Sequence, residues 1–289
     1  MREIQAHYEQ TPQTPLVHYT SAAGLQGILN SKSLWATHIR FLNDSKEFVH
    51  AVELALAHLS TIQQRQSDAG LDALCKALHV RLEGMPGNTW IISFSEARDT
   101  LSQWRAYGGE GGYSIEFDAA SLSQLASKQH FAFVRCEYDR SRQVDLIRDL
   151  IESSINAFPQ YRPPPPNEDS DLETRARFFA SSWFFPKMLR LGSSMKHPAF
   201  SEEQEWRLVG GLYKTNTIAS VRAQGPLLVP YVNFELGEAN GTIDAVKSIQ
   251  IGPNSYSQEL ADMGVYCLLR AAKLTPIRTT RSLTPYRPK

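Results

Sequence analysis

The segment Leu16-Val17-His18-Tyr19-Thr20-Ser21 marks the point where the first predicted strand turns into a helix. Two apolar residues precede a polar His-x-Thr step, and Ser21 then stands at an N-cap position before apolar residues that recur at helical spacing as far as Leu29. A second strand follows at residues 33–37. Because a strand-to-helix turn directs backbone N–H groups and short polar side chains into a cleft, this step suits an anionic or sugar-bearing ligand.

Composition limits the class of protein. The 289 residues are 42% hydrophobic and 21% charged, as expected for a globular chain with a sizeable core. Thirty basic and thirty acidic residues cancel, so no bulk charge attracts nucleic acid or a membrane. No signal peptide and no apolar run of about 18 residues is visible, so we expect a cytoplasmic protein.

Three widely spaced cysteines, Cys75, Cys136 and Cys267, predict neither a disulfide framework nor a metal site, and we expect all three to be buried. The polar residues 1–15 predict an extended lead-in, and residues 16–289 predict a single domain with an exposed proline-rich and acidic loop at about 160–173. The remaining periodicity predicts helices at 48–62, 71–82, 144–155, 174–191 and after Ser257, and strands at 89–95, 113–117, 131–138, 206–209, 227–232, 246–253 and 277–282.

The first segment resembles the opening of the ADP-ribosyltransferase superfamily, in its His-Tyr-Glu branch. The resemblance implies that His18 holds the adenosine ribose of NAD and that Thr20 supports the turn, with Tyr19 beside them at the cofactor. A structural histidine beside a helix cap is the alternative. Asn43 lies in a later turn, where it either caps the following helix or contacts the ligand.

The middle of the chain occupies the place of the second superfamily motif, a tyrosine that stacks on nicotinamide. Here the strand ends in Ser93-Phe94-Ser95, so the expected tyrosine is absent. If Phe94 alternates inward with Ile92, Ser93 lines the cleft and Trp104 or Tyr107 must close it, unless both aromatics are core residues. Arg105 between them matches the chemistry of a pyrophosphate.

The third constellation precedes the strand at 206–209. Period-two alternation places Glu203, Glu205 and Arg207 on one face if the strand extends back that far. In the superfamily motif the second glutamate, here Glu205, binds the nicotinamide ribose and stabilises the positive charge that develops as nicotinamide leaves. Glu203 resembles the residue that orients or deprotonates the acceptor. A solvated strand edge is the alternative reading.

The three motifs occur in the superfamily order, and the chain also resembles an uncharacterised bacterial domain family of unknown function. The superfamily resemblance implies an α+β fold, a single domain with a central, mainly antiparallel split sheet flanked by helices. It also implies transfer of ADP-ribose from NAD, without a metal, to a protein or nucleic acid acceptor, as in a toxin or defence effector with an inhibitor protein. An NAD glycohydrolase, an inactive nucleotide- or partner-binding module and a metal-independent nuclease are the alternatives. His18, Thr20 and Glu205 are expected to converge on one cavity.

Overall fold

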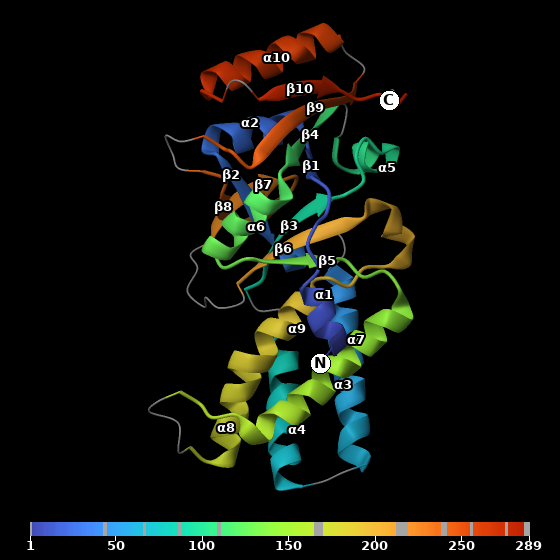
Figure 1. Ribbon diagram of the computed structural model, residues 1–289, viewed down its shortest axis with the longest axis vertical. Helices are drawn as coiled ribbons and strands as arrows, with labels where there is room; N and C mark the ends of the chain where they lie inside the picture. Colours follow the sequence, from blue (N-terminus) through green and yellow to red (C-terminus); the bar gives the residue numbers. More distant parts are fainter. Residues whose placement is uncertain are drawn as a thin grey trace.

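The computed structural model describes residues 2–42, 45–65, 68–85, 88–108, 111–164, 170–211, 219–237, 242–254, 257–274 and 277–285. The fold is α+β, a single domain built on one open, mixed sheet with helices on both of its faces. Figure 1 shows the sheet in one half of the molecule and a bundle formed by α3, α4, α7, α8 and α9 in the other.

The sheet runs in the order β10-β9-β4-β1-β3-β2-β8-β7, with β6 pairing β3 and β5 pairing β6 outside this path. Its strands are β1 (Leu16–Thr20), β2 (Ser33–His38), β3 (Trp90–Ser95), β4 (Gly111–Phe117), β5 (Ala132–Arg135), β6 (Glu205–Gly210), β7 (Ser220–Gln224), β8 (Leu227–Glu235), β9 (Val246–Asn254) and β10 (Arg278–Arg281). Within the described strands every pairing is antiparallel except that of β9 with β10.

The sheet divides at β3. β6 pairs with one edge of β3 along its whole length, from Trp90 opposite Gly210 to Ser95 opposite Glu205. The other edge is shared, because β1 pairs there only at Ser95 and β2 only at the opposite end of the strand. β1 and β2 therefore diverge from β3, and this split positions the candidate site.

The helices cover the sheet in two groups. The described helices, in chain order, are α1 (Arg2–Tyr8), α2 (Ala22–Ser31), α3 (Ser45–Arg65), α4 (Ala69–Glu83), α5 (Leu101–Gln103), α6 (Ala119–Lys128), α7 (Arg140–Ala157), α8 (Leu172–Phe179), α9 (Phe185–Gly192) and α10 (Gln258–Ala271). Two π-helical turns, η2 (Trp104–Gly108) and η4 (Ala180–Phe184), and three 3-10 turns, η1 (Ile39–Phe41), η3 (Phe158–Gln160) and η5 (Pro198–Glu203), complete the elements.

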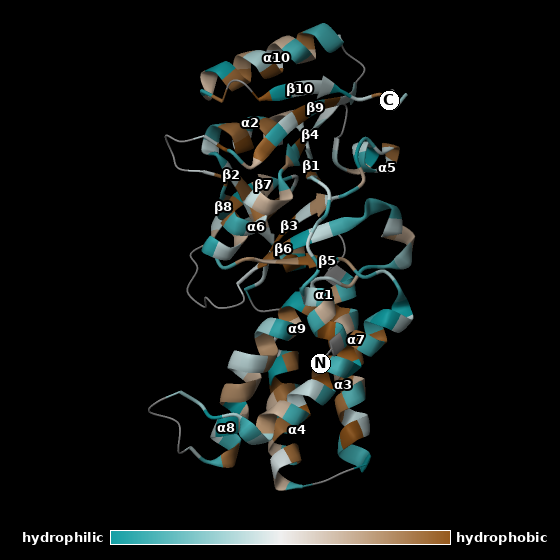
Figure 2. Ribbon diagram, in the orientation of Figure 1, coloured by the Kyte–Doolittle hydropathy of each residue, from teal (hydrophilic) through white to brown (hydrophobic). Residues whose placement is uncertain are grey.

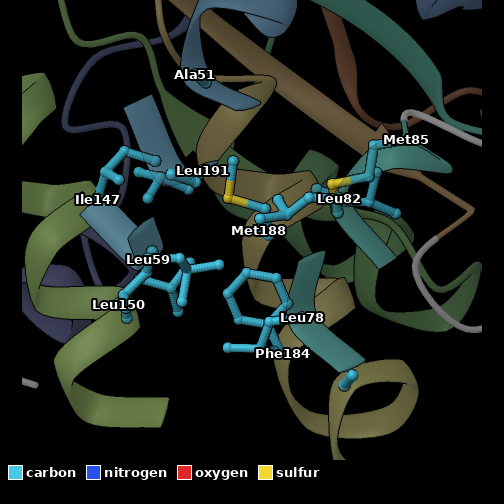
Figure 3. Packing of buried hydrophobic residues seen from close by; sticks show 14 of the residues in the cluster. Ala51, Leu59, Leu78, Leu82, Met85, Ile147, Leu150, Phe184, Met188 and Leu191 are labelled. Atoms are coloured by element: carbon cyan, nitrogen blue, oxygen red, sulfur yellow. The ribbon is translucent and has the colours of Figure 1, made fainter. Parts of the chain in front are cut away.

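One hydrophobic core lies between the sheet and α2, α6 and α10, and it takes in Ile92 and Phe94 of β3. A second core fills the helical bundle and reaches the other face of the same strand at Ile91. Figure 3 shows Phe184 and Met188 packing among leucines from α3, α4 and α7. In Figure 2 these helices carry hydrophobic and hydrophilic residues together along their length, as amphipathic helices do.

The predicted helix at 174–191 continues through Pro186. Proline lacks a backbone N–H and would break the regular ladder. The chain instead forms η4, where the N–H of Phe185 donates to the carbonyl of Ala180, five residues back. The π-helical turn thus lies between α8 and α9, and Pro186 stands in the first turn of α9, where a proline is tolerated.

Two expectations need correction, and a third is tested only in part. The lead-in is not extended over residues 2–8, because α1 forms there and the Ile4 N–H donates to the Asp149 carboxylate on α7 at 3.0 Å. Cys267 is exposed on α10, whereas Cys75 and Cys136 are buried. Residues 165–169 of the predicted loop lie outside the described residues. No helix in the described ranges is both long and apolar enough to cross a membrane.

Candidate functional site

A cavity opens at the split between β1 and β3. Its volume is about 60 Å³, or about 350 Å³ with the open space at its mouth. It is lined by Val17, His18, Tyr19, Ser93, Phe94, Ser95, Gln103, Tyr107, Glu203 and Glu205. The hollow accommodates a small group or a few water molecules, so a larger ligand must extend through the mouth.

His18 spans the split. Its Nδ1 lies 2.9 Å from the carbonyl oxygen of Ser93, beyond the last β1–β3 pair at Val17. Because a carbonyl only accepts, Nδ1 carries the proton, and a neutral ring then offers Nε2 as an acceptor. Burial lowers the pKa of His18 from its ordinary value, which favours this neutral form. The imidazole can therefore accept a hydrogen bond from a ligand hydroxyl.

The two residues after His18 have structural contacts. The Tyr19 hydroxyl donates to the carbonyl of Ala97 at 2.9 Å, and its ring meets the Trp104 ring edge-on at 4.8 Å. Thr20 does not line the cavity. A Cβ atom added to Gly24 would lie 2.0 Å from the Thr20 hydroxyl oxygen, so Thr20 packs closely against the first turn of α2.

β3 presents serines to the cavity and a phenylalanine to the core. Phe94 is 2% exposed and meets the Phe117 ring edge-on at 5.6 Å. The Ser95 hydroxyl donates to the carbonyl of Glu203 at 2.5 Å, tying the start of β6 to the end of β3. Ser93 thus lies at the cavity as predicted, and Phe94, although it packs in the core, also contributes to the lining.

The π-helical turn η2 supplies an aromatic at the cavity mouth. Tyr107 lines the cavity and is 43% exposed. Trp104 is buried, and its indole Nε1 donates to Asp99 at 2.8 Å. Neither Trp104 nor Arg105 lines the cavity, so of the two aromatics proposed to close it the structure places Tyr107 there.

A buried charge cluster forms the far wall. Lys196 donates to both Glu203 and Glu205. Arg207 binds Glu205 in a fork, with Nε 2.8 Å from Oε1 and Nη2 3.1 Å from Oε2, and its Nη1 donates to the carbonyl of Ser193 at 2.8 Å. The buried Glu205 carboxylate is therefore held by two cations.

These contacts fix the charge of the cluster. Burial alone would raise the pKa of Glu205, but Arg207 and Lys196 outweigh it and lower that pKa to about 2. Burial would lower the pKa of Lys196, and the neighbouring carboxylates raise it instead. Both groups are ionised at neutral pH.

The strand carrying Glu205 does not extend back to Glu203. Glu203 ends η5, and Gln204 has a left-handed backbone with φ of 44° before β6 begins. The two carboxylates meet at Lys196 because the chain turns there, not because they alternate along one strand. Glu205 and Arg207 do share a face, as predicted.

Alternation sends His18 and Glu205 to opposite faces of the sheet. His18 pairs with Ile115, a residue of the core under α2 and α10, whereas Glu205 pairs with Ser95 on the other face. Both still line one cavity, because the sheet is open at the split. The expected convergence therefore includes His18 and Glu205 but not Thr20, and it departs from a cleft on a single face.

The sequence prediction missed Lys196, Gln103 and Tyr138. The Tyr138 hydroxyl accepts the backbone N–H of Glu205 at 2.9 Å, and Gln103 lines the cavity. Lys196, nine residues before Glu205, could have been considered, since a buried carboxylate needs a cation. Asn43 lies outside the described residues.

A second hollow of about 160 Å³ lies beside the first, and Val17 belongs to both. Its remaining lining is polar and comes from β4, β9, β10 and the segment after β3: Arg98, Ser114, Glu116, Ser248, Gln250 and Thr280. The two hollows together give the region around β1 room for a ligand larger than the first cavity.

Comparison with family models gives a match to part of the chain. Residues 103–208 match the model of a family described as a protein of unknown function, DUF2971, over less than half of the chain. The matched segment includes Tyr107, Glu203 and Glu205 but not β1 or β3. No curated protein and no solved structure matches. None of these comparisons links the chain to the ADP-ribosyltransferases.

Proposed function

We propose that the cavity binds NAD and that the protein transfers ADP-ribose to a macromolecular acceptor, on a fold of the ADP-ribosyltransferase kind. The observation that carries the proposal is the meeting of His18, Ser93 and Glu205 at one cavity, although they stand far apart in the sequence. The resemblance extends the proposal to a toxin or defence effector. The acceptor is a protein or a nucleic acid.

The residues present offer distinct contacts to such a substrate. The neutral His18 ring accepts from a ribose hydroxyl through Nε2. Tyr107 offers a flat surface at the mouth, where nicotinamide is too large for the hollow alone. A carboxylate near the sugar lowers the barrier to departure of nicotinamide by stabilising developing positive charge. Glu203 also lines the cavity, which supports a role for it in orienting the acceptor.

One observation favours a second candidate, a nucleotide-binding module without catalysis. Three hydrogen bonds from Lys196 and Arg207 occupy the Glu205 carboxylate. Two cations beside one carboxylate offset the negative potential that a developing cation requires. In that case the cavity recognises a nucleotide and leaves it intact.

Nicotinamide release from NAD and NAD binding by calorimetry separate the candidates. A transferase releases nicotinamide, and Glu205→Gln cuts the rate by orders of magnitude while the affinity changes little. Because Glu205 is also structural, the rate is normalised to the folded fraction at low temperature. Glu202→Gln, an exposed neighbour on η5, is the matched control.

The outcomes are distinct. Binding without release by the unmodified protein supports the binding module. Absence of NAD binding rejects the transferase and favours a binding module with a different ligand. Equal loss of affinity and rate in Glu205→Gln assigns Glu205 a structural role only, and His18→Ala then tests whether the cavity itself holds the ligand.

A further inference from the structure

An aromatic pair, one ring exposed and the other half-buried, lies on β2 and β8, outside the cavity. The Trp35 ring on β2 and the Tyr231 ring on β8 are 4.7 Å apart at an angle of 33°. Trp35 is 40% exposed, which is unusual for the side chain that gains most from burial. Tyr231 pairs with Thr37 on one side and Ser220 of β7 on the other.

A cation completes this group, which we name the aromatic platform: Trp35, Tyr231 and Arg222. The Arg222 guanidinium carbon lies 5.4 Å from the Trp35 ring centre and 5.9 Å from that of Tyr231. Its Nη2 donates to the Thr37 hydroxyl at 3.0 Å, which fixes the guanidinium beside both rings. Other guanidinium N–H groups make no hydrogen bond within the described residues and so remain available to an anion.

We propose that the aromatic platform binds a nucleotide, with its base stacked on Trp35 and Tyr231 and its phosphate on Arg222. Aromatic side chains exposed on a sheet are a common surface for stacking unpaired bases. A guanidinium fork matches two phosphate oxygens. The base and the phosphate are the shared chemistry of a free nucleotide and of single-stranded nucleic acid, and experiment distinguishes the two sources.

The platform opens on the same side of the sheet as the charge cluster. Trp35 and Thr37 are two residues apart on β2, so their side chains lie on the same face of the sheet. Thr37 pairs with Ile91 of β3, and Ile91 lies on the same face as Ser93, two residues further along. Ser93 pairs with Arg207 on β6. The inference does not rest on the chemistry proposed for the cavity, because the platform shares no residue with it.

Fluorescence anisotropy with a short labelled oligothymidylate, measured on the full chain, tests the proposal. Trp35→Ala and Tyr231→Ala should each weaken binding about tenfold or more, as loss of a stacking partner does. Arg222→Gln should weaken binding and reduce the slope of log affinity against log salt by about 0.7, the value for one phosphate contact with a single strand.

Two controls separate binding from folding. Tyr266→Ala removes an exposed aromatic that also has an arginine beside it, on α10, and should leave binding unchanged. Trp35→Phe should keep most of the affinity and abolish the quenching of tryptophan fluorescence by the oligonucleotide. A merely structural role for Trp35 would not produce that loss of quenching.

Thymidine monophosphate as competitor identifies the source. If thymidine monophosphate displaces the labelled oligonucleotide at similar concentrations, the ligand of the aromatic platform is a free nucleotide. If it does not displace the oligonucleotide, the ligand is single-stranded nucleic acid. The proposal is overturned if oligothymidylate and thymidine monophosphate both fail to bind, or if binding is the same in Trp35→Ala and Tyr266→Ala. A linear oligosaccharide or a protein that binds through Trp35 in place of both nucleotides would overturn it as well.

Discussion

Glu205 carries a buried carboxylate whose charge depends on Lys196 and Arg207. Glu205→Gln removes the carboxylate that Arg207 binds and one of the two that Lys196 binds, in a site where all three side chains are almost inaccessible to water. Removing one partner of a buried ion pair costs about 3–5 kcal/mol. We expect a loss of about that size in the free energy of unfolding, measured by urea denaturation.

Arg207→Met added to Glu205→Gln should recover part of the lost stability, since it removes the guanidinium that Glu205 paired, whereas Lys196 keeps Glu203. Glu202→Gln on the exposed turn should leave stability unchanged. A change below about 1 kcal/mol in Glu205→Gln would show that water reaches the cluster and screens it.

His7 is a second buried titratable group, 2% exposed on α1 with its Nε2 3.3 Å from the Ser194 hydroxyl. Burial, with Arg190 nearby, lowers the pKa of His7 from 6.5 to about 4. Between these pH values the unfolded chain binds the proton and the folded protein does not, so His7 lowers stability as pH falls. The loss reaches about 2 kcal/mol near pH 5.

Urea denaturation of the unmodified protein and of His7→Gln, across this pH window, measures the effect. Glutamine keeps a hydrogen-bonding group but does not titrate, so the variant should lose less stability on acidification. Parallel pH profiles for the two proteins would show that α1 opens before His7 is protonated. His18, whose pKa is also lowered by burial, accounts for part of the slope that remains in the variant.

The site could be predicted from sequence only in part. Alternation along β3 and the pairing of Glu205 with Arg207 follow from period two, which a strand imposes on any sequence. The meeting of His18 and Glu205 follows from the split instead, and no local pattern encodes where two strands diverge. Lys196 enters the cluster through the left-handed turn at Gln204, which the sequence prediction replaced with a longer strand.

Among the elements, long helices such as α3 and α7 were predictable, because apolar residues recur at helical spacing along their sequences. α6 was missed although Asp118 caps it and Leu122 and Ala126 lie at helical spacing. β7 was missed because an exposed edge strand has no buried alternation to reveal it. η2 has five residues whose π-type hydrogen bonds depend on the packing of Trp104.

Asp99 links η2 to the segment that follows β10 through hydrogen bonds. Its carboxylate accepts from Trp104, from the Ser282 hydroxyl and from the backbone N–H of Leu283. Its backbone is left-handed, with φ of 52°, a conformation that aspartate and asparagine tolerate better than most residues. The position of Tyr107 at the cavity mouth therefore depends on contacts made after β10.

Asp99→Ala should release both segments, because it removes every acceptor of the carboxylate. We expect faster amide hydrogen exchange in residues 104–108 and 282–285 and a loss of about 1–3 kcal/mol in the free energy of unfolding. Asp99→Asn, which keeps one acceptor and tolerates the same backbone, should show a smaller effect. Unchanged exchange at 104–108 in Asp99→Ala would show that Trp104 packing alone holds η2.

Two large hydrophobic cores among the described residues share the same strands. Ile91 and Val209 of β3 and β6 belong to the core of the helical bundle, whereas Ile92 and Leu208 belong to the core beneath α2 and α10. Loss of either core exposes one face of both strands. We therefore expect the bundle and the rest of the sheet to unfold together, although Figure 1 shows them as separate halves of the molecule.

Phe184→Ala in the bundle and Phe234→Ala in the other core test this coupling, since both side chains are fully buried. Each should lower the free energy of unfolding by about 3–5 kcal/mol, the cost of a cavity the size of a phenyl ring. If the cores unfold as one unit, the slowest-exchanging amides of α7 and of β8 lose the same free energy in either variant. The exposed Val80→Ala should change neither. Loss of protection confined to α7 in Phe184→Ala would instead show that the helical bundle opens by itself while the sheet and its cavity remain folded.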